Sequence, residues 1–483
     1  MTDADNRTRW LALYVLCLGS LMIVLDVTIV NVALPSIRED LGFSETSLAW
    51  VVNAYLLTYG GFLLLGGRLG DLFGHRKLFL AGIALFTLAS LACGLSTTQW
   101  MLVTARTVQG VGGAVASAVS LSLMMTLFTE PAERAKAMGL FGFVAAGGGS
   151  IGVLLGGVLT DLISWHWIFL VNVPIGVLVC LLSLRLLPRE RASAMSGRLD
   201  VAGALTVTAA LMLAVYAIVN GNQNGWTSAE TLGLLGGAVV LLALFLGIES
   251  RVQSPLVPLG LFRLRNLRVS NLVGVLWAAA MFAWFFLSAL YLQLVLGYSP
   301  LQVGLAFLPS NLIMGAFSIG LSAKLVMRFG FRKPLAIGLF LAAAGLALFV
   351  RAPVDGTFLV DVLPSMILLG VGAGMAFNPV LLAAMSDVEP SEAGLASGLV
   401  NTSFLMGGAL GLAVLASVAS SRSHTLRLGG AGELSALTGG YHIAFLVGAA
   451  FAAAAAVIGG TLLRENPAAA HEPAQGAPAA EIS

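Results

Sequence analysis

The feature that most restricts the fold of this chain is a series of fourteen long apolar runs. A helix needs about 20 apolar residues to cross a bilayer, and only 10% of these residues are charged, against about 25% in soluble proteins. The runs are continuous and do not alternate, which argues against barrel strands. We therefore predict an all-α membrane protein with fourteen transmembrane helices, over residues 11–34, 48–66, 78–97, 101–128, 137–160, 167–187, 199–219, 231–248, 269–294, 301–323, 334–350, 359–384, 394–419 and 441–463.

The distribution of Lys and Arg predicts the orientation. With a cytoplasmic N-terminus, 20 of the 25 basic residues lie in inner segments and four in outer loops, while Arg106 lies within a run. Cytoplasmic loops carry such an excess. We expect a protein integral to the cytoplasmic membrane with both termini in the cytoplasm. The Pro/Ala-rich segment 465–483 is predicted to be a disordered cytoplasmic tail.

An internal repeat predicts how the spans are grouped. GGRLGDLFGHRK at 66–77 aligns without gaps with SAKLVMRFGFRK at 322–333, and GVGGA at 110–114 resembles GVGAG at 370–374. Such repeats are a feature of secondary transporters. We predict a six-helix half at 1–190, two inserted helices at 191–262 and a second six-helix half at 263–464.

Two ionisable residues, Asp26 and Arg106, lie well inside apolar runs, at similar distances from the outer boundary. A charge at mid-span is costly and predicts a function and a partner, so we expect the two to meet. Desolvation raises a carboxyl pKa and a nearby cation lowers it, so a change of surroundings could make Asp26 a proton carrier. A static structural pair is the alternative. Asn31 and Gln109 are the polar residues expected to join their network.

The basic loop between the second and third runs has two interpretations. It could serve merely as a positively charged anchor, but its repetition favours a cytoplasmic gate formed by Gly67, Asp71, Arg76 and Lys77. Met327 replaces the aspartate in the second copy, so the expected gate is asymmetric.

Glycines recur at every fourth position in the run 137–160. Gly148, Gly152 and Gly156 form a small-residue stripe that permits close helix packing. We expect this packing seam to join the other half of the protein and to exclude protons from an empty cavity.

Other polar and aromatic residues in or near the spans are candidates for a substrate cavity, although helix packing explains most of them equally well. These candidates are Asn53, Tyr55, Trp284, Tyr291, Asn311, Asn378 and Asn401.

With these motifs in place, the chain from about residue 9 to residue 464 resembles the fourteen-span drug:proton antiporters of the major facilitator superfamily. The matching motifs are LDVTIVNVALP at 25–35, GGRLGDLFGHRK at 66–77, RTVQGVGGA at 106–114 and WHWIFLVNVP at 165–174. The resemblance implies the major facilitator fold, proton coupling through Asp26, Arg106 and Gln109, and gating by the loop at 66–77. One departure is Val153, where the family's motif has proline, so occlusion would rely on the glycines.

The resemblance also implies export of amphipathic drugs or antibiotics, driven by the proton gradient with no cofactor. The expected partners are a small amphipathic substrate, protons and the bilayer, without nucleic acid, and we expect a monomer. Within transport, a dedicated exporter of one metabolite or self-made antibiotic, or a nutrient importer, remains open. A non-transporting sensor is the alternative of another class. An enzyme is not expected, because the sequence has neither a phosphate-binding loop nor convincing metal-ligand spacing.

Overall fold

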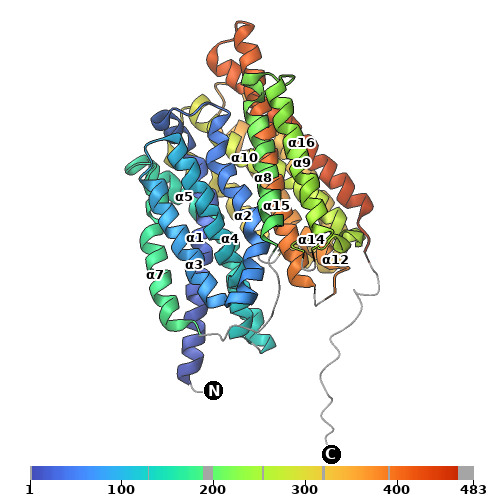
Figure 1. Cartoon of the computed structure of the whole chain (residues 1–483). Helices are drawn as coiled ribbons and strands as arrows, with labels where there is room; N and C mark the ends of the chain where they lie inside the picture. Colours follow the sequence, from blue (N-terminus) through green and yellow to red (C-terminus); the bar gives the residue numbers. More distant parts are fainter. Residues whose placement is uncertain are drawn as a thin grey trace, which may run out of the picture.

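The computed structural model describes residues 3–128, 130–188, 200–252, 255–317, 321–389 and 392–465. Every regular element in this part of the chain is helical, and the helices run roughly parallel in one bundle (Figure 1). The prediction of an all-α membrane protein is confirmed. The predicted disordered tail lies outside the described residues, apart from Glu465.

The first half of the bundle begins with a long helix that continues beyond its apolar run. Its helices are α1 (Asp3–Leu41), α2 (Trp50–Phe73), α3 (His75–Gly94), α4 (Gln99–Leu127), α5 (Pro131–Leu162), the short α6 (Trp167–Leu170) and α7 (Asn172–Leu186).

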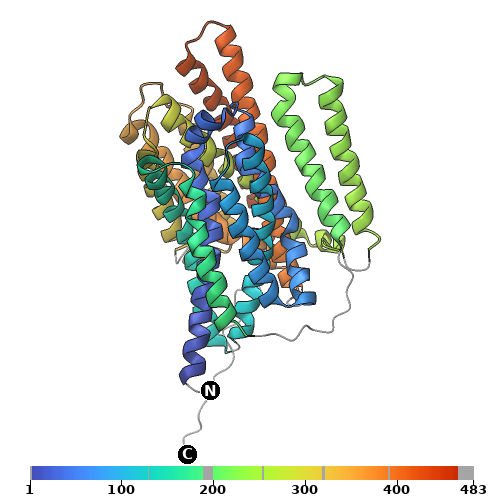
Figure 2. The same ribbon diagram turned by 60° about the vertical axis from the view of Figure 1, so that its left-hand side comes forward.

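An antiparallel helix pair follows, formed by α8 (Val201–Asn224) and α9 (Ala229–Glu249), and it stands at the side of the bundle (Figure 2). It packs through α8 on both α2 and α15. These are the helices predicted as an insertion between the two halves.

The second half repeats the pattern with more interruptions. It comprises α10 (Arg265–Leu290) with a π-helical extension at Tyr291–Val295, α11 (Pro300–Ala316), α12 (Ser322–Phe329), α13 (Arg332–Phe349), a π-helical turn at Phe358–Val362 that leads into α14 (Leu363–Met385), α15 (Ala393–Leu428) and α16 (Glu433–Leu462).

Twelve helices in the described residues are long and apolar enough to cross a membrane. The two predicted spans outside this set, 137–160 and 301–323, coincide with α5 and α11, of which the described residues give the apolar stretches Ile151–Leu162 and Pro300–Ala316. The count of fourteen transmembrane helices therefore stays a prediction.

The internal repeat has a counterpart in the backbone. Gly74 ends α2 with φ 93°, and Gly330, its partner in the repeat, ends α12 with φ 73°. Glycine adopts such left-handed conformations without strain. The two loops thus turn at equivalent glycines.

The helices after these loops also pack alike. A Cβ atom added to Gly82 in α3 would lie 2.9 Å from the carbonyl oxygen of Gly112 in α4, and one added to Gly338 in α13 would lie 2.8 Å from that of Gly372 in α14. Each half thus has one helix pair whose backbones touch through a pair of glycines, at corresponding positions.

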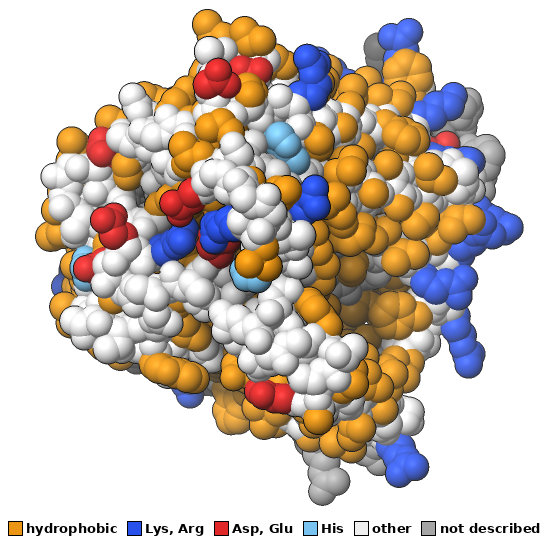
Figure 3. All heavy atoms as spheres, turned by 90° about the horizontal axis from the view of Figure 1, so that it is seen from above, with side chains coloured by type: hydrophobic (Ala, Val, Ile, Leu, Met, Phe, Trp, Pro, Cys, Tyr) orange, Lys and Arg blue, Asp and Glu red, His pale blue; other side chains and the backbone are white. Residues whose placement is uncertain are grey.

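The two halves are bonded to each other at the end of the bundle opposite the N-terminus, which we call the distal end. Glu45 accepts from Arg427 at 2.7 Å, Asp161 accepts from the Ser299 hydroxyl at 3.3 Å, and the Gln293 amide donates to the carbonyl of Val32 at 2.9 Å. Figure 3 shows this end of the molecule, with acidic and basic side chains close together. These contacts close the bundle there.

Candidate functional site

The structure brings Asp26 of α1 and Arg106 of α4 into direct contact in the interior of the first half. Both side chains are fully buried, and Nη1 of Arg106 donates to Oδ2 of Asp26. The expected meeting of the two charges is therefore present. A buried pair of this kind needs further hydrogen bonds to offset the loss of water.

Gln109 supplies some of those bonds. Its amide nitrogen donates to Oδ1 of Asp26 and to the hydroxyl of Ser90, both at 2.7 Å, and its oxygen accepts from Arg106 at 2.7 Å. Arg106 and Gln109 lie three residues apart on α4 and therefore share a face. The resemblance that assigned Gln109 to this site fits its position.

Asn172, at the first position of α7, completes the shell around the carboxylate. Its amide donates to Oδ1 of Asp26 at 3.1 Å, and the residue is almost fully buried. We did not single out Asn172 from the sequence, nor Ser90 or Cys93, whose thiol lies 3.6 Å from the Gln109 oxygen. The one available signal for Asn172 was its place in the WHWIFLVNVP motif.

Arg106 has contacts that do not depend on Asp26. Its Nε donates to the carbonyl of Val51 at 2.9 Å, and its guanidinium carbon lies 4.3 Å from the ring centre of Tyr55 and 5.5 Å from that of Phe169. Aromatic faces attract such a cation, more strongly when it is desolvated. The site thus surrounds Arg106 on several sides, with the ring of the substrate-cavity candidate Tyr55 beside the charged pair.

The glycines of α4 allow this approach. A Cβ on Gly110 would lie 2.5 Å from the carbonyl oxygen of Tyr55, so α2 and α4 could not pack this closely with a larger residue there. Thr98 starts α4 by accepting a hydrogen bond from the backbone of Met101. The close packing of α2 on α4 and the fixed start of α4 together determine where Arg106 lies within the first half.

Asn31 does not join the Asp26 cluster in this structure. Its amide donates to the carbonyls of Val27 and Thr28 in its own helix, at 3.4 and 3.2 Å. Five residues along a helix rotate a side chain by about 140° from Asp26, which turns Asn31 away from α4.

The glycine stripe of α5 faces α1 of the same half, which corrects the expectation that it packs against the other half. Cβ atoms added to Gly148, Gly152 and Gly156 would lie closest to atoms of Val24, Thr28 and Ile29 respectively. The neighbouring Gly157 makes the contact across the halves, since a Cβ there would lie 2.6 Å from the Pro300 carbonyl oxygen of α11.

The contacts described for the loop at 66–77 lie within the first half. Asp71 is 3.4 Å from the ring of His75, and Arg76 donates to the carbonyl of Leu184 at 2.6 Å. Lys77 is exposed, and a Cβ on Gly67 would meet no atom within 4 Å. The gating role remains an expectation.

The substrate-cavity candidates fall into two groups. Asn53, Trp284 and Asn311 are buried, and polar atoms of each have no hydrogen-bond partner among the described residues. The other candidates differ: the Tyr291 hydroxyl donates to the Pro353 carbonyl at 2.7 Å, Asn401 is exposed and bonds Ser397 of its own helix, and Asn378 is partly buried with an interaction of its own.

The aromatic cluster of α10 is mostly core packing. The rings of Trp284 and Phe285 lie 4.4 Å apart, and Phe285 stacks on Phe307 of α11 at 5.4 Å. Among the described residues, no group of three or more His, Cys, Asp or Glu side chains could hold a metal ion.

Comparison with solved structures gives the same architecture. The chain matches the xylose transporter XylE from E. coli, in a partially occluded inward open conformation, with a TM-score of 0.61 over 93% of this chain and 97% of that one at 15% identity. It matches the nucleoside transporter NupG with a TM-score of 0.63, over 94% of this chain and 100% of that one at 11% identity. At such identities the likeness concerns the fold.

Sequence relatives are much closer. A puromycin resistance protein of Streptomyces alboniger is 42% identical, over 86% of this chain and 83% of its own length. A cephamycin export protein of Amycolatopsis lactamdurans is 39% identical, over 94% and 93%. A multidrug resistance protein of Mycobacterium tuberculosis is 38% identical, over 86% and 76%. The family description of the Major Facilitator Superfamily matches residues 16–412. The chain therefore belongs to the major facilitator superfamily and is a membrane transporter, not an enzyme.

Proposed function

We propose that this transporter is a proton-coupled antiporter of the fourteen-span drug:proton antiporter group, which exports amphipathic drugs or antibiotics across the cytoplasmic membrane. The observation that carries the proposal is the Asp26 carboxylate, buried and bonded to Arg106, Gln109 and Asn172. An ionisable acid held inside a membrane protein marks a proton or ion pathway. Both termini would face the cytoplasm. The proton gradient would drive transport, and no cofactor would be required.

The surroundings of Arg106 suit an acid that changes protonation state. When Asp26 takes up a proton, the attraction between the two side chains weakens and Arg106 would be left as a buried cation, which is costly. The Val51 carbonyl, the Gln109 oxygen and the Tyr55 ring remain as its partners. The cluster can therefore exist in two states, and in both of them the Arg106 cation keeps hydrogen-bond and aromatic partners.

The packing offers a route by which such a change could reach the second half. Asp26 lies on α1, which packs on the glycine stripe of α5, and α5 meets α11 at Gly157. A second connection is the bond from Gln293 to the Val32 carbonyl of α1. A shift of α1 would act on both of these contacts.

An amphipathic substrate fits the buried polar groups that have no partner. The amide of Asn53, the indole nitrogen of Trp284 and the amide nitrogen of Asn311 lie within apolar surroundings, without a hydrogen-bond partner among the described residues. Unsatisfied buried donors are costly, so a ligand or water that bonded them would be favoured. The names of the relatives, which concern antibiotic resistance or export, support an exporter of such compounds.

A second candidate is a dedicated exporter of one compound. It is supported by relatives named for a single antibiotic, the cephamycin export protein and the tetracenomycin C resistance and export protein of Streptomyces glaucescens. The breadth of the substrates that move in one assay separates it from multidrug export.

The test uses inside-out vesicles with an imposed pH gradient, and compares the wild type with Asp26→Asn and Asp355→Asn. Asp355 is an exposed acid in the second half and serves as the control. We expect several cationic and neutral amphipathic compounds to release protons with the wild type and Asp355→Asn, and none with Asp26→Asn. Unchanged coupling in Asp26→Asn would refute the role of the site. Binding of compounds without flux in the wild type would indicate a sensor.

A further inference from the structure

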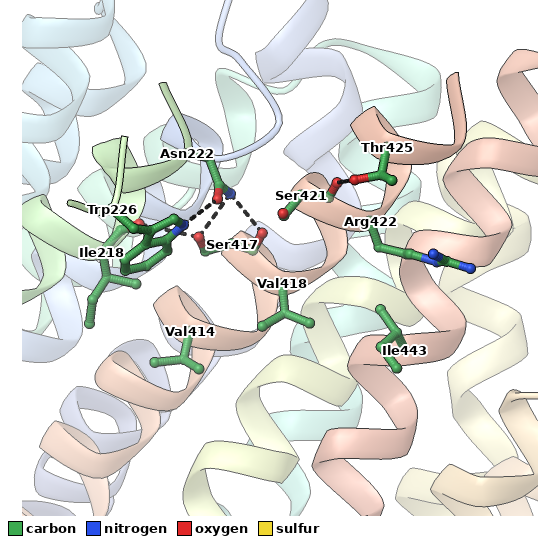
Figure 4. Close-up of a pocket in the computed structure, with 10 residues that line it drawn as sticks. All are labelled: Ile218, Asn222, Trp226, Val414, Ser417, Val418, Ser421, Arg422, Thr425 and Ile443. Atoms are coloured by element: carbon green, nitrogen blue, oxygen red, sulfur yellow. Dashed lines mark hydrogen bonds between the residues drawn. The ribbon is translucent and has the colours of Figure 1, made fainter. Parts of the chain in front are cut away.

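A cavity of about 530 Å³ lies at the side of the bundle, between the helix pair α8/α9 and the second half (Figure 4). Its walls come from α8, from the turn between α8 and α9, and from α15 and α16. It is separate from the Asp26 cluster, which lies inside the first half.

One part of the cavity is apolar. Ile218 of α8, Val414 and Val418 of α15 and Ile443 of α16 line it. The polar groups beside them are already bonded to each other: Asn222 donates to the carbonyl and hydroxyl of Ser417 at 2.8 and 2.9 Å. These bonds hold α8 on α15 and leave the amide of Asn222 unavailable to a ligand.

The other part of the cavity is basic. Arg422 and Thr425 line it toward the distal end, and no acidic residue is among its lining residues. Arg422 is exposed and makes no ion pair with any residue that the structure describes. An occupant with a negative charge would complement this end.

The position suits a lipid. The predicted span in α15 ends at residue 419, so Val414 and Val418 are expected to lie within the hydrocarbon, and Arg422 roughly 4.5 Å beyond its edge at about 1.5 Å per residue. Trp226, an exposed tryptophan of the kind that gathers at membrane interfaces, also lines the cavity and donates to the side chain of Asn222. The polarity thus changes along the cavity as it does along one leaflet.

We propose that this cavity binds an anionic phospholipid, whose headgroup contacts Arg422 and whose acyl chain lies against Val414, Val418 and Ile443. The lipid fills the space between the inserted helix pair and the second half, beside the bonds from Asn222 to Ser417. The site is independent of proton coupling.

The experiment uses the full-length wild-type protein in nanodiscs that contain equal amounts of photoreactive phosphatidylglycerol and photoreactive phosphatidylcholine. After illumination, mass spectrometry of peptides from α8, α15 and α16 gives the labelling by each lipid. One basic residue near anionic lipid contributes about 1 kcal/mol, so we expect about fivefold more labelling by phosphatidylglycerol.

Three variants make the result specific. Arg422→Gln is expected to lower labelling by phosphatidylglycerol to the level of phosphatidylcholine, and Val418→Trp to reduce labelling by both lipids by filling the apolar part. Arg351→Gln removes an exposed arginine that does not line the cavity and should change nothing. Because the altered side chains lie at the surface or in the cavity, the fold should persist, and retained dye export in each variant verifies it.

Equal labelling of the wild type by the two lipids would overturn the proposal, since the cavity would then accept any acyl chain. A preference that persists in Arg422→Gln would also overturn it. Loss of lipid labelling on addition of an exported dye would assign the cavity to the transported compound instead.

Discussion

Gln293 of the second half donates its side-chain amide to the backbone carbonyl of Val32 in the first half, at 2.9 Å. Val32 lies less than two helical turns beyond Asp26 on α1. The helix that carries the buried acid therefore also carries a direct bond between the two halves, and Gln293 itself lies in the π-helical part that extends α10.

Replacing Gln293 with leucine should favour opening of the distal end. The change removes one hydrogen bond between the halves, which contributes about 1 kcal/mol and corresponds to about a fivefold shift in population. Spin labels at Thr97→Cys and Arg351→Cys report the distance between the halves by pulsed electron paramagnetic resonance. In the distribution of distances between the labels, the population at longer distance should increase. Asn220→Ala, which removes a bond within α8 alone, is the control and should leave the distribution unchanged.

Replacing Asn172 with alanine should impair proton coupling more than replacing Asn31 with alanine. Asn172 holds Oδ1 of Asp26, whereas Asn31 bonds only its own helix in the described contacts. We expect Asn172→Ala to lower proton-driven export about tenfold and to displace its pH profile, since a lost bond to a charged group costs about 1.5–3 kcal/mol. Equal effects of the two substitutions would contradict the assignment of Asn172 to the site.

The positions of Asn172 and Asn31 show how much of the site could be predicted from the sequence. Asp26 and Arg106 stood out because charges inside apolar runs are rare, and the depth of each could be counted along its own run. Asn31 was expected to be a partner because it is near Asp26 in the chain, but its side chain leaves α1 in a different direction from that of Asp26. Asn172 comes from a helix start far along the chain, and only the packing of α7 against α1 brings it to the acid.

The fold was predictable for a similar reason. Apolar runs and the repeat at 66–77 and 322–333 indicated the helices and their grouping, because the bilayer imposes length and apolarity on each span. Contacts between helices were less predictable. The glycine stripe showed that α5 packs closely against another helix, but not which one. The neighbour depends on the direction in which a residue points, and the single step from Gly156 to Gly157 turns that direction by about 100°.

The paired glycines of the two halves should respond alike to substitution. Gly82→Ala and Gly338→Ala each place a methyl group within 3 Å of a backbone oxygen of the facing helix. Overpacking of this kind costs about 1–3 kcal/mol, so thermal unfolding in detergent should occur several degrees lower for both. Gly67→Ala meets no atom within 4 Å and should leave the melting temperature unchanged. A large effect of one glycine alone would show that the halves do not share this contact.

Enlarging Gly157 should separate α5 from α11. Gly157→Val forces a side chain against the Pro300 carbonyl. Gly149→Val introduces the same side chain where an added Cβ lies 3.8 Å from the methyl group of Thr28, which is an ordinary contact distance. We expect Gly157→Val to increase labelling of a cysteine placed at Ser299 by an impermeant maleimide several-fold, with Gly149→Val close to the wild type. Unchanged labelling in Gly157→Val would mean that another contact holds α5 against α11.

The closure of the distal end includes a few individual polar bonds, from Arg427 to Glu45, from Ser299 to Asp161 and from Gln293 to Val32. Each such bond contributes only about 0.5–1.5 kcal/mol net. One elementary charge that moves through 100 mV releases about 2.3 kcal/mol, which is comparable with the combined strength of two of them. These bonds therefore cost little to break compared with the energy of the gradient, so the gradients across the membrane, and not the strength of the closure, would set the direction in which cargo moves.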